Sequence, residues 1–262
     1  MPRLPRRKPD TEPDLRPGAD PTTEGTATLG ELVARAADGD GDRRAQLATL
    51  ARGLAAGARG VAGGRVRDAG QLLADVLADA APRLRIRDAA TLRLHHPGRT
   101  EDEIAEALIR NAAWTTAAFG AAVGALAAVE FAAPPTLLAA PVQLAAETLA
   151  VAATEVKLVA ELHEILGHPA PGSGTQRGSA YLMSWVRQRA VDPTAGVAGL
   201  SAVLGAAAKR ELRTMLTRRA TRGMTKLAPF LAGAVAGGVV NRRVTRSFGD
   251  KVGAELRGRR GR

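Results

Sequence analysis

Three glutamates, Glu130, Glu147 and Glu155, lie in otherwise apolar stretches of the chain, and their surroundings could give them chemistry. A carboxylate is costly to bury unless it is paired, and such groups often mark functional sites. On one helix, Glu147 and Glu155 would share a face but lie ~12 Å apart, too far to act as acid and base on one bond. We therefore expect pairing with an Arg of another helix or a place at an exposed edge. Asn241 is a fourth candidate for a buried polar group.

The four histidines lack the spacing of a helical metal site. His95 and His96 are adjacent, and His163 and His168 are five residues apart, whereas two ligands on one helix face are about four residues apart. The chain has no cysteine and no HExxH motif, so we expect no metal and no cofactor. The GxSxG, Walker and GxGxxG motifs are also missing. The sequence therefore predicts no enzymatic activity, although a site assembled from separate helices would show no motif.

Positive charge is concentrated at the C-terminal end. Residues 209–262 hold 15 basic and three acidic residues, whereas residues 1–208 hold 22 basic and 23 acidic ones. Such a segment attracts polyanions, either anionic lipid or nucleic acid. Its only aromatic residues are Phe230 and Phe248, too few for base stacking, so sequence-specific nucleic-acid binding is not expected. Arginine supplies 32 of the 37 basic residues, which indicates a GC-rich bacterial genome.

The elements that must position these residues are helices. Thr28 with Glu31, and Thr100 with Glu103, match capping boxes, and no run of alternating β-branched residues predicts a strand. The sequence predicts an all-α helical bundle with a central Ala/Gly-rich helical hairpin and a basic C-terminal helix. The expected helices cover 29–38, 42–57, a segment around 72–77, 100–129, 141–167, 179–191, 194–227 and 230–257.

Composition divides the chain into three parts. Residues 1–26 contain six prolines and few apolar side chains, which predicts a disordered tail because too little surface can be buried to offset the entropy of ordering. Residues 27–99 carry amphipathic helices, and residues 100–258 form the helical core. Within that core two glycine pairs are spaced by four, which places each pair on one helix face and allows close helix packing. The pairs are Gly120 with Gly124 and Gly233 with Gly237.

Two apolar stretches raise the question of a membrane. Residues 112–129 are uncharged, but half of them are alanine, and Glu147 and Glu155 interrupt 142–160; insertion of this hairpin would be marginal. We favour a soluble core and keep a spanning hairpin as the alternative. The 14 residues 227–240 are too short to cross a bilayer. Basic residues that flank or follow this run could contact anionic lipid: Lys226, Arg242, Arg243, Arg246 and Lys251.

Three sequence stretches resemble the EcsC family of bacterial proteins. They read RTEDEIAEALIRNAAWTTAAFGAAVGA, VKLVAELHEILGHP and KLAPFLAGAVAGGVVNRRVTRSFGDKVGAEL. The resemblance covers roughly residues 100–257, although EFAAPPTLLAAP stands where the family has a more glycine-rich turn. It implies an all-helical protein with no established enzymatic activity. The family name comes from an operon that also encodes an ABC transporter, which implies a role at or near the cytoplasmic membrane.

These observations together predict a non-enzymatic helical protein that associates peripherally with the membrane through its basic segment 209–262. The expected partner is an anionic membrane surface or a membrane transporter, and the expected location is the cytoplasm, at the inner face of the cell membrane. The alternatives are an integral membrane protein with a hairpin at 112–129 and 142–160, and an enzyme without a local motif. The sequence leaves the oligomeric state open.

Overall fold

All regular secondary structure in the described part of the chain is helical. The computed structural model describes residues 27–39, 41–60, 69–131, 140–189 and 228–260. Its helices are α1 (Leu29–Asp38), α2 (Arg43–Gly60), α3 (Ala69–Ala80), the 3-10 helix η1 (Ala81–Arg83), α4 (Ala89–His95), α5 (Glu101–Phe131), α6 (Ala140–Ile165), α7 (Gly174–Gln188) and α9 (Ala228–Arg260). The predicted all-α fold is confirmed. The predicted tail 1–26 and helix 194–227 lie outside the described residues.

The two predicted capping boxes both form. The Glu31 N–H donates to the Thr28 hydroxyl at 3.2 Å, and the Thr28 N–H donates to the Glu31 carboxylate at 3.0 Å. Likewise, the Glu103 N–H donates to the Thr100 hydroxyl at 3.3 Å, and the Thr100 N–H donates to the Glu103 carboxylate at 2.7 Å. Each box satisfies backbone donors that a helix start would leave unpaired. Helices α1 and α5 therefore begin where the sequence predicts.

The start of α7 was predicted wrongly. The sequence predicts a helix over 179–191, but α7 begins at Gly174. Ser173 and Gln176 form a third capping box, in which the Ser173 N–H donates to the Gln176 side chain at 3.0 Å. Because this box was overlooked, the prediction missed one turn of helix that carries Arg177, the ion-pair partner of Glu164.

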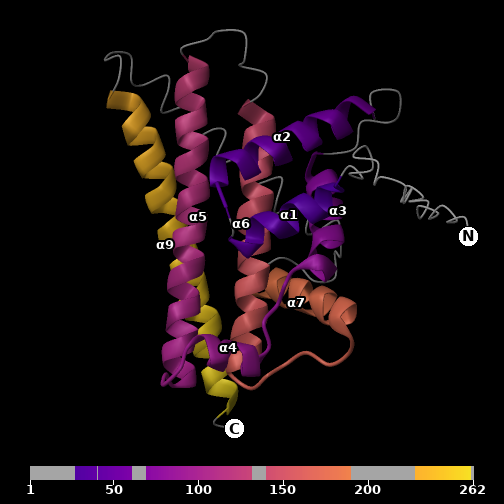
Figure 1. The fold of residues 1–262 in the computed structure, drawn as a ribbon, viewed down its shortest axis with the longest axis vertical. Helices are drawn as coiled ribbons and strands as arrows, with labels where there is room; N and C mark the ends of the chain where they lie inside the picture. Colours follow the sequence, from indigo (N-terminus) through magenta and orange to yellow (C-terminus); the bar gives the residue numbers. More distant parts are fainter. Residues whose placement is uncertain (1–26, 40, 61–68, 132–139, 190–227, 261–262) are drawn as a thin grey trace, which may run out of the picture.

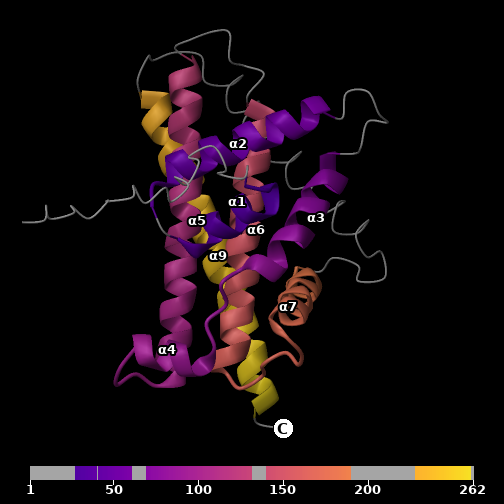
Figure 2. The same cartoon turned by 45° about the vertical axis from the view of Figure 1, so that its right-hand side comes forward.

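Three long helices form the body of the protein (Figures 1 and 2). α5 runs from the α4 end upward, and α6 and α9 both run back down, so α9 is antiparallel to α5 and parallel to α6. The predicted hairpin partner of α5 is α6, and the two do pack together, but α5 has its most extensive contact with α9. Helices α1, α2 and α3 pack against this body through α6. Buried residues of 27–99 and 100–258 belong to one hydrophobic cluster.

Glycines set the distance between α5 and α9. A Cβ atom built on Gly120 would lie 2.6 Å from the carbonyl oxygen of Gly237, and one on Gly237 would lie 2.9 Å from the carbonyl oxygen of Gly120. No real side chain tolerates such contacts with a backbone, so only glycine permits this approach. The surroundings of Gly124 and Gly233 lie outside what the structure describes. The observed glycine contact therefore joins one member of each predicted pair.

None of the described helices combines the length and the apolar character that a membrane span requires.

Substitution of Gly120 by alanine should lower the free energy of unfolding by about 2–3 kcal/mol, because the new methyl group meets a backbone carbonyl that cannot rotate away. Urea denaturation monitored by circular dichroism measures the change. Gly258→Ala is the matched control, since Gly258 also lies within a helix, here α9, but has nothing within 4 Å of the added Cβ. This substitution should be neutral or stabilising by about 1 kcal/mol. Equal effects of the two substitutions would contradict the close packing.

Candidate functional site

Glu155 is the centre of a buried polar cluster between α6, α7 and α9. Its side chain is 1% exposed. It accepts hydrogen bonds from the indole N–H of Trp185 at 3.0 Å, from the hydroxyl of Thr245 at 3.1 Å, and from the guanidinium of Arg189 through both Nε and Nη2. The carboxylate therefore has an arginine counterion and two neutral donors, which compensate the loss of water. This is the structural role that the sequence analysis favoured for buried carboxylates.

The polar cluster continues along the seam of the three long helices. The Thr116 hydroxyl donates to Thr245 at 3.0 Å, and the Asn241 amide donates to the backbone carbonyl of Thr116 at 3.2 Å and to Glu147 at 2.7 Å. Glu147 and Asn241 are both half-buried. Glu147 and Glu155 thus bind different residues of α9, Asn241 and Thr245, and do not share a hydrogen-bond partner there. The side chain of Glu130 lies outside what the structure describes.

The solvent-exposed surface of α9 carries both apolar and basic side chains. We call this surface the α9 outer face and define it by Val235, Val239, Val240, Arg242, Arg243, Val244 and Lys251. The four valines are 62%, 59%, 41% and 45% exposed, in order of number. Exposed apolar side chains at neighbouring turns of one helix form a patch of the kind that contacts partners or lipid. On α5, Trp114 is 54% exposed and lies under the Arg242 guanidinium, 3.9 Å from the ring centroid.

Only some of the C-terminal cations have acidic partners. Arg246 pairs with Glu106, Arg257 pairs with Asp102 at 2.5 Å, and Arg259 pairs with Glu255. In contrast, Arg242, Arg243 and Lys251 have no ion pair within the described ranges. Of the five cations that the sequence assigned to lipid contact, Arg246 is therefore already paired, and Lys226 lies outside the described residues. Among the side chains of 209–262 that the structure describes, the cations without an ion pair therefore lie on the α9 outer face.

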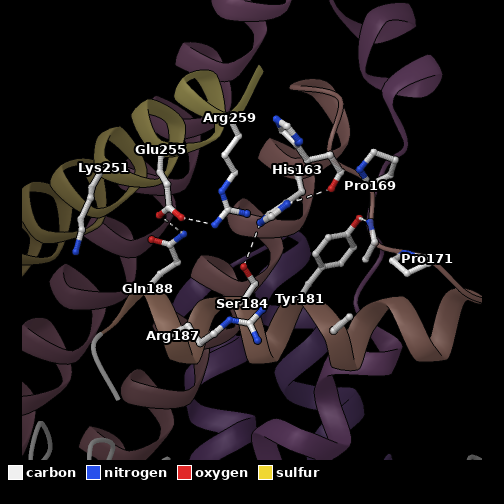
Figure 3. A pocket seen from close by; sticks show the side chains of 13 residues that line it. His163, Pro169, Pro171, Tyr181, Ser184, Arg187, Gln188, Lys251, Glu255 and Arg259 are labelled. Atoms are coloured by element: carbon white, nitrogen blue, oxygen red, sulfur yellow. Dashed lines mark hydrogen bonds and ion pairs between the residues drawn. The ribbon is translucent and has the colours of Figure 1, made fainter. Parts of the chain in front are cut away.

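A pocket of about 500 Å³ lies lower in the structure, between the end of α6, the following loop, α7 and the end of α9 (Figure 3). We call it the α6–α7–α9 pocket. Its lining includes His163, Tyr181, Ser184, Arg187 and Arg259. The volume falls within the usual range for small-molecule sites. Sequence analysis missed this pocket because its residues come from three separate segments and match no local motif.

His163 is held in a defined orientation at this pocket. Its Nδ1 lies 3.1 Å from the backbone oxygen of His168, which can only accept, so Nδ1 carries a hydrogen. Its Nε2 lies 3.1 Å from the Ser184 hydroxyl. Burial lowers the pKa of His163 below the ordinary value of 6.5, which favours the neutral ring near pH 7. Nε2 then accepts the Ser184 hydroxyl hydrogen.

The histidines are not arranged as metal ligands. The Nε2 of His168 donates to the backbone oxygen of Leu256 at 2.9 Å, which joins the loop after α6 to α9. His95 and His96 lie at the end of α4. Among the described residues, no group of three or more His, Cys, Asp or Glu side chains could hold a metal ion.

Comparison with protein-family models, curated proteins and solved structures finds no match to this chain. The resemblance to the EcsC family stays a prediction from the sequence motifs.

Substitution of Glu155 by glutamine should lower the free energy of unfolding by about 3 kcal/mol, because Arg189 loses its counterion in a largely buried place. The side-chain volume is unchanged, so a cavity does not contribute. The matched control is Asp102→Asn, which breaks the exposed pair with Arg257 and should cost about 1 kcal/mol or less. Chemical denaturation of both variants measures the difference, and similar losses would show that Glu155 is not an important anchor.

The buried His163 should make folding stability depend on pH. Its pKa is lower in the folded state than in the unfolded state, so the unfolded chain takes up the proton first as the pH falls. Stability should therefore decrease from pH 6.5 downward until the folded-state pKa is passed. His163→Gln should flatten this slope between about pH 7 and 5.5, measured by urea denaturation across the range. An unchanged slope in this variant would assign the effect to other groups.

Proposed function

We propose that this protein is a non-enzymatic helical protein that associates peripherally with an anionic membrane surface through the α9 outer face. The observation that carries the proposal is the presence, on one side of one helix, of unpaired cations beside exposed valines. Arg242 and Arg243 stand between Val239 and Val244 along the chain, within three turns of helix. Helices that lie in a membrane interface combine these two features.

The electrostatic part of the interaction comes from Arg242, Arg243 and Lys251. Each basic residue close to an anionic leaflet contributes ~1 kcal/mol at physiological salt. The three cations have no acidic partner in the described segments of the chain, so their charge is not neutralised by the protein itself. The pairs of Arg246 with Glu106 and of Arg257 with Asp102 reduce the charge that the composition of 209–262 suggests, because both acids belong to α5.

The apolar part comes from the valines and Trp114. A tryptophan at a membrane interface places its ring at the level of the head groups, and a guanidinium stacked on that ring would bring a cation to the same level. Val235 and Val239 lie one helical turn apart and are the most exposed apolar residues of α9. The role near a membrane that the EcsC resemblance implies agrees with this proposal.

Co-sedimentation with lipid vesicles tests the proposal. The full chain should pellet with vesicles that contain phosphatidylglycerol, pellet weakly with phosphatidylcholine alone, and be released in about 0.5 M salt, where charges are screened within roughly 4 Å. Arg242→Gln combined with Arg243→Gln should lower the partition coefficient more than about tenfold. Equal recovery with neutral and anionic vesicles, independent of salt, would refute the electrostatic interaction.

A second double variant provides the charge control. Arg85 and Arg93 are 81% and 53% exposed at the side chain and lie on the α3–α4 connection and α4. Replacing both by glutamine removes the same formal charge from another part of the surface. Vesicle binding of this variant should match the wild type, and a loss equal to that of the α9 variant would attribute binding to net charge alone.

Tryptophan fluorescence reports the contact independently. The chain has two tryptophans, of which Trp114 is 54% exposed and Trp185 is 3% exposed. Anionic vesicles should shift the emission to shorter wavelength because the ring of Trp114 leaves water. Trp114→Phe should abolish the shift while leaving the fold intact. A shift that persists in this variant would place the lipid contact elsewhere.

A further inference from the structure

The α6–α7–α9 pocket has a positively charged lining. Arg187 and Lys251 contribute unpaired cations, since neither has an acidic partner in the part of the chain that the structure describes. Arg259 contributes a third cation, and Glu255 is the only carboxylate in the lining. Glu255 is already engaged, because it accepts from Gln188 at 2.7 Å and from Arg259. Arg187, Lys251, Arg259 and Glu255 together give the lining a formal charge of +2, which suits a dianion.

One wall of the pocket is suited to an organic group. Tyr181, Pro169 and Pro171 line it on the side opposite Lys251 and Glu255 (Figure 3). The Tyr181 hydroxyl donates to Glu164 at 2.5 Å and accepts from the Ala170 N–H at 2.9 Å, so its ring is fixed. Pro169 and Pro171 are exposed and provide apolar contact surface at low entropic cost, and the Tyr181 ring, which is 1% exposed, supports this wall from behind.

His163 and Ser184 provide a polar contact that can adapt to an anion. The Ser184 hydroxyl donates to Nε2 of the neutral His163 ring. A bound oxyanion would favour the protonated ring, whose Nε2–H would donate to Ser184 and release the serine hydrogen toward the ligand. The other charged or titratable groups around the ring are Arg259 and Glu255 of α9, His168 of the loop and Tyr181 of α7.

We propose that the α6–α7–α9 pocket binds a phosphate monoester, with the phosphate near Arg187 and Ser184 and the organic group against Pro169 and Pro171. A phosphate monoester carries a charge between about −1.5 and −2 near pH 7, which matches the lining. Such a group occurs on soluble metabolites and on the head group of phosphatidic acid, and the chemistry of recognition is the same for both.

Calorimetric titration of the full chain with phenyl phosphate tests the pocket. We expect saturable binding to one site, and no binding of phenol, which has the same ring without the charge. Arg187→Gln should weaken phenyl phosphate binding at least tenfold, and Ser184→Ala should weaken it severalfold. Arg187 is exposed, so its replacement should not affect folding; Arg93→Gln is the matched control and should bind as the wild type does. If phenyl phosphate shows no saturable binding, or binds the Arg187 variant as tightly as the wild type, the pocket does not bind a soluble phosphate monoester.

Vesicles distinguish the two sources of phosphate. If the ligand is a lipid, the chain should prefer phosphatidic acid over phosphatidylglycerol, Arg187→Gln should abolish that preference, and phenyl phosphate should compete for it. Binding to phosphatidylglycerol through the α9 outer face should survive in the Arg187 variant, so failure of the pocket and failure of the proposed function are separable. Saturable phenyl phosphate binding without a lipid preference would support a soluble ligand. If phenyl phosphate does not bind and the chain shows no preference for phosphatidic acid, the proposal is overturned.

Discussion

The backbone contact between Gly120 and Gly237 determines which side of α9 faces outward. Because these two residues lack side chains, α5 and α9 approach until a Cβ on either would collide with the other's carbonyl oxygen. That contact selects the inner face of α9, which continues through Asn241, Thr245, Val252 and Leu256 at helical spacing. The opposite face is then left to the exposed valines and arginines. The close contact of the two backbones, and not charge, therefore determines the orientation of α9.

Buried polar groups fix the register along the same seam. Leucine and alanine side chains pack almost equally well after a shift of one turn, whereas hydrogen bonds of Glu155 to Trp185, Arg189 and Thr245 require one alignment. Thr116 and Asn241 add a second layer of the same kind. Burial of a carboxylate is expensive, and here its partners come from two other helices. The polar seam therefore gives specificity to a core that is otherwise built from small, similar side chains.

Local sequence signals predicted where helices begin and end, but they could not predict side-chain contacts between distant segments. The Thr28 and Thr100 capping boxes and the left-handed Gly167 depend on residues within one turn, and they marked helix ends correctly. The partner of Glu155 could be predicted as an arginine but not as Arg189, 34 residues away. His163 lies on α6 and Ser184 on α7, so their contact joins residues 21 positions apart. The spacing of the histidines argued against a metal site, but it gave no sign that His163 lines a pocket.

The bond from His168 to the carbonyl of Leu256 has a practical consequence for work with truncated chains. By composition alone, the last turns of α9 resemble a removable basic tail. In the structure they hold the loop after α6 in place, and Val252 and Leu256 are completely buried. A shortened chain would lose interior side chains together with its cations. Loss of function after such a deletion would therefore not show that charge is needed. Only substitutions on the exposed side of the intact helix can separate the effect of the positive charge from the effect of the buried side chains.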